Sequence, residues 1–333
     1  MRIWLLALVL ACSDKSADTH ESSETGFSGP DWSILADEVG EGVLLSAYSA
    51  GEELLAVGGA LGGSGPGVLA RWDGARLCTE TLVEDAALWW IHGPSETEWY
   101  AVGERGTVVH VVDGVFSRED VNTSYTLYGV WADEDGVWVV GGDVAAGSGR
   151  VWQRTEDGWE TVLETTDGVI FKVWKHWVVG DSVAWFRLED GSFEERPPSE
   201  RLLTVRGGSE EHVWAVGGST SSAVLEWSEG AWASLDTSGL SAPLNGIWTD
   251  LGQHVWVAGM IGTQAYSDDG GESWTIPDFP LTPHHFHAVW KHQDDVLFLG
   301  GNLMSAAGPW FGTIGRWGTN SEAVVATTCP SRR

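Results

Sequence analysis

The 333-residue chain carries 48 acidic and 18 basic residues, which gives a formal net charge of −30 at pH 7. A chain this acidic repels phosphate, which argues against a nucleic-acid partner, and an aromatic content of 11% excludes a disordered chain. The 22 Trp residues are far more than an ordinary domain carries, and a Trp position repeated along the chain would explain the excess.

The chain begins with a pattern typical of an export signal. Met1 and Arg2 precede an apolar run over residues 3–10, which is too short to cross a bilayer core of about 20 residues but fits a secretory signal. Val9-Leu10-Ala11-Cys12 resembles the lipobox of bacterial lipoproteins. The resemblance implies that residues 1–11 are a signal peptide and that Cys12 becomes the lipid-attached first residue. An ordinary secreted protein that is cleaved nearby is the alternative.

A polar, Ser-rich segment follows Cys12 and continues to residue 30. Its composition predicts a flexible tether between a lipid anchor and a folded body over residues 31–333. Ser13 follows the cysteine where an Asp would favour the inner membrane, so the resemblance implies an exported protein held at the outer membrane of the cell envelope by its lipid alone.

An apolar run that ends in glycine occurs seven times after this tether, at intervals of 37 to 45 residues. The glycines are Gly58, Gly103, Gly141, Gly180, Gly217, Gly259 and Gly300. A period near 40 residues is typical of β-propeller blades with four antiparallel strands. Asp-Gly or Glu-Gly pairs that begin 10 to 16 residues after most of these glycines predict the hairpin between the third and fourth strands. We therefore expect an all-β, seven-bladed propeller, with six or eight blades as alternatives.

The fourth blade and the closure of the ring are the two unusual places. Only six residues separate Trp174 from Gly180, which predicts a very tight first hairpin. Residues 31–35 read as an isolated fourth strand that completes the last blade. Residues 322–328 compete for the same place, and the sequence does not decide between them.

The repeat resembles the WD40/YVTN/BNR-like propellers of secreted bacterial proteins, through pairs such as LYGVW (127–131) with VWVVG (137–141). Residues 267–274 (SDDGGESW) also match the Asp-box of that family. The resemblance implies a structural hairpin in which the matched residues stabilise the turn. These residues are Ser267, Asp269, Gly271 and Trp274.

Candidate ligand-binding residues cluster near the start of the last blade. His284, His285, His287 and His292 are the densest group of imidazoles, which are common metal ligands. The variable loops between second and third strands lie on the same face of a propeller, and the loop over residues 301–312 adds Met304, Trp310 and Phe311. If the protein binds a ligand, we expect contact at His285, His287, Met304, Trp310 and Phe311. The alternatives are ordinary packing of the histidines and a loop that plugs the channel.

Two cysteines remain after lipidation. Cys78 and Cys329 would lie in an oxidising compartment, where a bridge between the first and last blades could lock the ring. Buried free thiols are the alternative.

These patterns favour a non-enzymatic binding or scaffold module for a protein or a glycan, with no catalytic residue, metal site or cofactor identified. A propeller hydrolase or lyase is the first alternative. Asp-boxes occur in sialidases, but the Arg-Ile-Pro motif of that family is missing and most arginines fall in outer strands or turns. A calcium-dependent surface protein is the second alternative, because acidic residues gather in the loops between first and second strands and in the turns between third and fourth strands.

Overall fold

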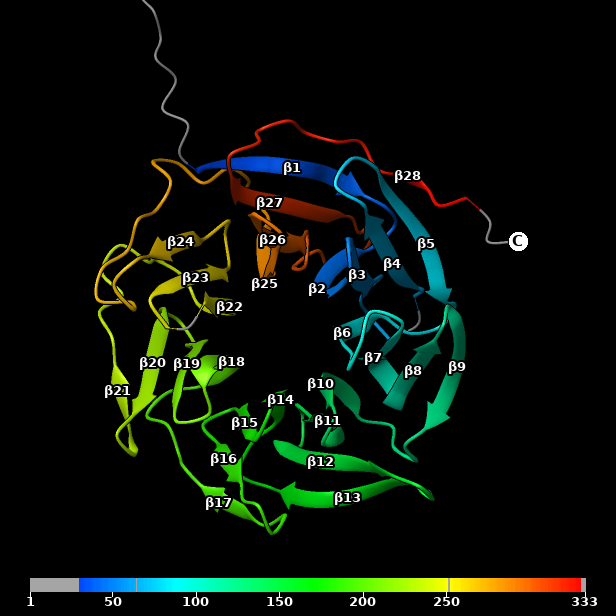
Figure 1. Cartoon of the computed structure of the whole chain (residues 1–333), viewed down its shortest axis with the longest axis vertical. Helices are drawn as coiled ribbons and strands as arrows, with labels where there is room; N and C mark the ends of the chain where they lie inside the picture. The colour runs from blue at the N-terminus through cyan, green and yellow to red at the C-terminus, as the bar shows by residue number, and fades with distance from the viewer. Residues whose placement is uncertain (1–29, 64, 251, 331–333) are drawn as a thin grey trace, which may run out of the picture.

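Seven antiparallel sheets form a closed ring in the computed structural model, which describes residues 30–63, 65–250 and 252–330 (Figure 1). Each sheet is one blade of a β-propeller, and its first strand lies nearest the centre of the ring. The predicted fold class is confirmed, with seven blades rather than six or eight.

Blades 1 to 3 are regular four-stranded meanders. Blade 1 contains β2 (Val43–Ala50), β3 (Glu53–Gly59), β4 (Gly67–Trp72) and β5 (Leu77–Val83). Blade 2 contains β6 (Leu88–His92), β7 (Glu98–Gly103), β8 (Thr107–Val112) and β9 (Val115–Asp120), with a short 3-10 turn, η1 (Glu104–Gly106), before β8. Blade 3 contains β10 (Thr126–Asp133), β11 (Gly136–Asp143), β12 (Ser148–Thr155) and β13 (Gly158–Thr165).

Blades 4 to 6 vary more. Blade 4 contains β14 (Ile170–Trp174), β15 (Trp177–Gly180), β16 (Ala184–Arg187) and β17 (Phe193–Glu195). Blade 5 contains β18 (Leu202–Ser209), β19 (His212–Gly217), β20 (Ala223–Ser228) and β21 (Ala231–Ser234). Blade 6 contains β22 (Leu244–Asp250), β23 (His254–Gly259) and β24 (Gln264–Ser267). The tight hairpin expected in blade 4 is present, because Trp174 pairs directly with Trp177.

The N-terminal strand closes the ring. Blade 7 consists of β25 (His285–His292), β26 (Asp295–Gly301) and β27 (Gly312–Gly318), and β1 (Asp31–Val39) is its fourth strand. β1 pairs antiparallel with β27, with Trp32 opposite Trp317. The competing segment lies elsewhere: its β28 (Thr327–Thr328) runs parallel to β5 on the outside of blade 1.

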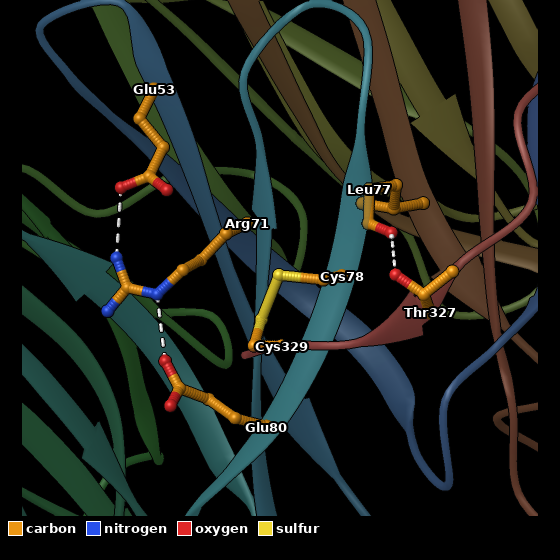
Figure 2. The surroundings of a disulfide bond; sticks show 7 residues. All are labelled: Glu53, Arg71, Leu77, Cys78, Glu80, Thr327 and Cys329. Carbon is orange, nitrogen blue, oxygen red and sulfur yellow. Dashed lines mark hydrogen bonds and ion pairs between the residues drawn. A yellow bond between two sulfur atoms is a disulfide. The ribbon is translucent and has the colours of Figure 1, made fainter. Parts of the chain in front are cut away.

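A disulfide fixes this C-terminal segment. Cys78 of β5 is bonded to Cys329, 251 residues later in the chain (Figure 2). The backbone N–H of Val324 donates to the carbonyl of Leu35 at 2.7 Å, and that of Cys329 donates to Thr79 at 2.9 Å. The segment therefore crosses from β1 of blade 7 to β5 of blade 1 and joins the two ends of the ring.

The repeated glycine has a steric cause. In every blade, a Cβ atom on this glycine would lie only 1.7 to 2.4 Å from the carbonyl oxygen of the first residue of the first strand or of the residue just before it. In blade 1 the oxygen is that of Val43, which would meet the Cβ on Gly58 at 1.7 Å. Only glycine permits this approach of the two innermost strands.

Tryptophans of the second strands pack against the next blade. Trp177 of blade 4 contacts Trp227 of blade 5 at 5.1 Å between ring centroids, and Trp256 of blade 6 contacts Trp317 of blade 7 at 5.4 Å. Large rings fill the wedge between twisted sheets, and the repeated Trp positions account for the Trp excess of the sequence.

Blade 6 departs from the predicted pattern in its fourth strand. The repeat predicts four strands in each blade, but the fourth strand of blade 6 is reduced to a single bridge between Tyr266 and Thr275. Instead, Ser267 Oγ donates to Asp269 at 2.7 Å and accepts from the N–H of Gly271 at 2.7 Å. These side-chain hydrogen bonds of Ser267 and Asp269 hold the turn where the other blades have strand pairing.

The expected signal peptide, the lipid-attachment residue Cys12 and residues 13–29 of the tether lie outside the described residues. Within the described part of the chain, no helix has the length and apolar character needed to cross a membrane.

Candidate functional site

The first strands present three successive levels of side chains around the axis of the ring. Each first strand has a bulge, so that one residue has no partner on the second strand. These unpaired residues form what we call the mouth level: Leu45, Trp89, Tyr128, Phe171, Leu203, Asn245 and His287. A bulge redirects a side chain out of the regular alternation.

The next residue along each strand forms the middle level, and the residue two positions further forms the inner ring. The middle level consists of Ser46, Trp90, Gly129, Lys172, Thr204, Gly246 and Ala288. The inner ring consists of Tyr48, His92, Trp131, Trp174, Arg206, Trp248 and Trp290.

A cavity of about 360 Å³ opens at the mouth level. Six of the seven mouth-level residues line it, all except Leu45. Its rim comes from loops between second and third strands, including Leu61, Val144 and Met304. The cavity therefore lies on the face that carries the variable loops.

The cavity is blind. The next void along the axis has a volume of only about 20 Å³ and is lined by Trp90, Lys172 and residues of the inner ring. Lys172 borders both spaces, so its side chain is the floor of the cavity.

Contacts between neighbouring side chains close the inner ring. His92 stacks on Trp131 with 3.9 Å between ring centroids, and the guanidinium carbon of Arg206 lies 3.3 Å from the centre of the Trp248 ring. Burial lowers the pKa of Arg206 to about 9, and burial and the charge of Arg206 lower the pKa of His92 to about 3.

Lys172 is a buried amine whose partners carry no charge. Its side chain is 3% exposed, its Nζ donates to the carbonyl of Tyr128 at 3.3 Å, and Nζ lies 3.0 Å from the centre of the Trp90 ring. Burial lowers the pKa of Lys172 well below its usual range, because removal from water penalises the charged form.

The two cavity histidines are held by backbone atoms. His287 Nδ1 donates to the carbonyl of Leu45 at 2.6 Å, and His285 Nδ1 accepts from the N–H of Ile261 at 3.0 Å. Burial and the nearby Lys172 lower the pKa of His287 to about 4, and burial also lowers the pKa of His285. Both imidazoles are thus neutral near pH 7.

The structure brings together three of the five residues expected to bind a ligand. His285, His287 and Met304 line the cavity. Phe311 packs on His284 at 4.9 Å between ring centroids, and neither Phe311 nor Trp310 contributes to the cavity wall. The expected histidine cluster is divided, because His292 lies at the other end of β25 and bonds to Ser49 of blade 1.

Sequence reasoning missed Lys172, Arg201 and Trp89 as cavity residues. A Lys within the apolar run IFKVW of a buried strand is a signal that could have identified the first of them. Trp89 could have been found by counting back from Gly103, since the strand pairing places Leu88 opposite this glycine and leaves Trp89 in the bulge.

The acidic loops do not assemble a metal site in the described part of the chain, where no group of three or more His, Cys, Asp or Glu side chains is placed to hold an ion. Several of these acids instead pair with histidines. Asp250 lies 2.9 Å from His254, and His110 lies between Glu98 and Glu119 at 2.9 and 3.0 Å.

Solved structures with the same architecture span almost the whole propeller. YCF48 bound to a D1 peptide aligns with a TM-score of 0.62 at 17% identity, over 87% of this chain and 97% of that one. The chain has the fold of WD40-like, seven-bladed propellers. The WD40 propeller domain of Doa1 aligns with a TM-score of 0.62 at 10% identity, over 85% of this chain and 96% of that one.

An enzyme shares the fold as well. A catalytically inactive virginiamycin B lyase from Staphylococcus aureus, in a structure with quinupristin, aligns with a TM-score of 0.68 at 10% identity, over 87% of this chain and 99% of that one. At these identities the likeness concerns the fold alone. No protein-family model and no curated protein matches the chain.

Proposed function

We propose that this protein is an exported, lipid-anchored binding module that holds a segment of a partner protein over the cavity face of its propeller. The observation that carries the proposal is the blind cavity of about 360 Å³ at the mouth level. Concave sites with apolar walls and a few polar groups are the usual form of ligand sites. A neighbour of the same fold, YCF48, has been solved with a bound peptide, which supports a protein ligand over a glycan.

The rim of the cavity supports a ligand that extends beyond it. Val144 and Met304 are 62% and 69% exposed, respectively, although both are apolar, and both line the cavity. Exposed apolar side chains around a cavity mark interaction surfaces. A peptide or loop seated in the cavity would cover them.

A hydrolase or lyase has less support from this cavity. The residues that line it include one arginine and no Asp or Glu, so it offers neither the carboxylate pair of a glycosidase nor an arginine cluster. Its two histidines are held by backbone bonds rather than by a nucleophile. We therefore propose binding without chemistry.

The test is capture of a partner from the cell envelope by the full chain carrying Cys12→Ser, which keeps the protein free of the membrane. The informative variant is Val144→Glu with Met304→Glu, which adds two charges to the rim. Val115→Glu with Val325→Glu is the matched control, because these apolar residues are 74% and 86% exposed and do not line the cavity. After crosslinking, we expect the rim variant to capture at least tenfold less partner protein than the unmodified rim does, and the control variant to capture as much. Equal capture by both variants would contradict the proposal.

The anchor is proposed from the lipobox resemblance at Cys12. In cells fed labelled palmitate, the wild-type chain is expected to become labelled and to fractionate with membranes. Cys12→Ser is expected to do neither, and label on the variant would contradict lipidation at this residue.

A further inference from the structure

The cavity contains three nitrogen donors whose hydrogen-bonding capacity is not used within the described chain. The Lys172 ammonium can donate three hydrogen bonds and its neutral amine two, but one carbonyl, that of Tyr128, is its acceptor. Arg201 Nε and Trp89 Nε1 are buried without any hydrogen-bond partner among the described residues. Buried donors are normally satisfied, so three incompletely satisfied donors around one cavity indicate a site for an acceptor.

No side-chain carboxylate among the described residues that line the cavity provides this acceptor. No Asp or Glu is among the residues that line it, although the chain has 48 acidic residues. Asp181 lies 3.7 Å from Arg201 Nε but is half exposed and does not line the cavity. An anion that enters the cavity would therefore meet Lys172 without competition from a built-in carboxylate.

The rest of the wall is apolar. Phe171, Leu203 and Tyr128 surround the floor, and Leu61, Val144, Met260, Leu303 and Met304 form the sides and the rim. The guanidinium carbon of Arg201 lies 5.0 Å from the centre of the Phe171 ring. Such a wall suits an apolar body and disfavours a strongly hydrated dianion, which would lose more water than the few donors replace.

We infer that the cavity binds an apolar carboxylate, with the carboxylate at Lys172 on the floor and the apolar body against the mouth level. The inference rests on the proposed binding function and specifies its ligand. Two sources share this chemistry: a free aromatic or aliphatic carboxylic acid, and the C-terminal residue of a peptide with an apolar side chain. A charge-assisted hydrogen bond is the strong interaction that such a site can form.

Binding of the carboxylate is coupled to protonation of Lys172. The empty cavity favours the neutral amine, because burial opposes the charge, and a bound carboxylate favours the ammonium. At a pH between the pKa of Lys172 in the empty site and its pKa in the occupied site, Lys172 takes up a proton when a carboxylate binds. The affinity for the carboxylate therefore falls as the pH rises above the pKa of the empty site.

Other charged and titratable groups face Lys172 from neighbouring strands and define its surroundings: His287, His285, Tyr128 and Arg201 at the cavity, and His92 and Arg206 below it. The pKa of each histidine is lowered, to about 4 in His287 and to about 3 in His92. Burial raises the pKa of Tyr128. Arg206, whose pKa is lowered to about 9, stays charged close to neutral pH. Between pH 7 and 8 the histidines and Tyr128 are therefore neutral and Arg206 is charged, so proton uptake in this range reports on Lys172.

The test is calorimetric titration of the full chain carrying Cys12→Ser. The free-acid arm compares N-acetylphenylalanine with N-acetylphenylalaninamide. The peptide arm compares a hexapeptide ending in Phe with the same peptide amidated at its C-terminus. We expect at least one carboxylate probe to bind at least tenfold more tightly than its amide, with proton uptake seen as a heat that changes with the ionisation enthalpy of the buffer. The arm that binds more tightly identifies the source.

Lys172→Met keeps an unbranched side chain that is one atom shorter, and it removes the amine. We expect it to lower carboxylate affinity at least tenfold, to abolish proton uptake and to leave amide binding unchanged. Lys291→Met is the matched control, because Lys291 follows Trp290 in β25 and does not line the cavity. Near-ultraviolet circular dichroism checks that each variant is folded. Arg201→Met provides a second variant should Lys172→Met unfold, with the same expected direction.

Equal affinity for acid and amide in both arms, unchanged carboxylate affinity in a folded Lys172→Met, or the absence of carboxylate binding would overturn the inference. These failures remain distinct from failure of the proposed function. Loss of partner capture in the Val144 and Met304 rim variant would still support a protein-binding face without a carboxylate site.

Discussion

Lys172 of blade 4 and Trp90 of blade 2 meet across blade 3, with Lys172 Nζ 3.0 Å from the centre of the indole ring. Gly129 occupies the equivalent position of blade 3, where a Cβ would lie 3.3 Å from the Cα of Lys172. The small residue lets two large side chains from non-adjacent blades come together. An aromatic face attracts a cation, but it does not replace the hydration that Lys172 loses.

The stability of the protein should therefore depend on the charge of Lys172. Its folded-state pKa lies below that of the unfolded chain, about 10.4. Between these two values the unfolded state binds more protons, so stability rises with pH. We expect Lys172→Met to melt at a higher temperature than the wild type when both are compared near neutral pH, with a difference that narrows toward pH 10.

Thermal unfolding at several pH values measures this difference, and Lys291→Met serves as the control. An advantage of Lys172→Met of about 1 kcal/mol corresponds to a shift of roughly 1.5–2 °C for a propeller of about 300 residues, because the entropy of unfolding is about 2.1 cal/mol/K per residue. A difference that stays constant from pH 7 to pH 10 would show that the charge of Lys172 does not carry the effect.

The repeat glycines should tolerate no side chain. In Gly58→Ala the new Cβ would lie 1.7 Å from the carbonyl oxygen of Val43, so the inner strands of blade 1 must separate. We expect a loss of about 3 kcal/mol or more, at the upper end for overpacking. Gly74→Ala in the same blade has open space around its Cβ and a φ of +91°, and should cost only about 1–2 kcal/mol. Similar denaturation midpoints for the two variants would refute the steric explanation.

The disulfide should stabilise the closed ring. Cys78 and Cys329 are 251 residues apart, and a native disulfide that closes a long loop contributes about 2–5 kcal/mol. We expect Cys78→Ser with Cys329→Ser to lower the melting temperature. A reducing agent should produce the same decrease in the wild type and none in the double variant. A wild-type protein whose melting is unaffected by reduction would contradict this contribution.

The Asp269 turn should lose its effect in acid. Hydrogen bonds from Ser273 and Ser267 lower the pKa of Asp269 to about 2. A carboxylate with a lowered folded-state pKa stabilises the protein above its unfolded value, about 3.9, and the effect disappears as the pH falls through the folded value. Asp269→Asn should thus be less stable than the wild type at pH 6, and the two should converge toward pH 2. A difference in stability between Asp269→Asn and the wild type that persists at pH 2 would show that the shape of the Asp269 side chain, and not its charge, stabilises the turn.

The sequence predicted the ring itself because each blade repeats the same physical constraint. Three features recur at one period: the glycine that lies against a carbonyl oxygen, the apolar second strand, and the Trp residues that pack between blades. In blade 5 they are represented by Gly217, Trp214 and Trp227. Closure was harder to predict. Residues 31–35 and 322–328 both have strand patterns, and only the tertiary pairing of Trp32 with Trp317 distinguishes them.

The candidate site was predicted only in part, because bulges shift the register. In the run LWWIH of β6, Trp90 looks equivalent to Trp131, yet the pairing places His92 at that level and Trp89 at the mouth. The loop over residues 301–312 provided Met304 but not Trp310, since loop conformation depends on contacts that the sequence pattern does not encode. Lys172 was missed because its partners, Trp90 and Tyr128, come from two other blades.

The most direct measurement of the central claim is the protonation of Lys172 with and without a carboxylate. The chain has four lysines, Lys15, Lys172, Lys175 and Lys291, so protein labelled with ¹³C at lysine Cε gives at most four signals, and Lys172→Met assigns one of them. We predict that this signal titrates well below pH 10, that N-acetylphenylalanine moves its midpoint upward, and that N-acetylphenylalaninamide does not. An ordinary midpoint in the free protein, or one that the carboxylate leaves unchanged, would contradict a carboxylate site at the floor of the cavity.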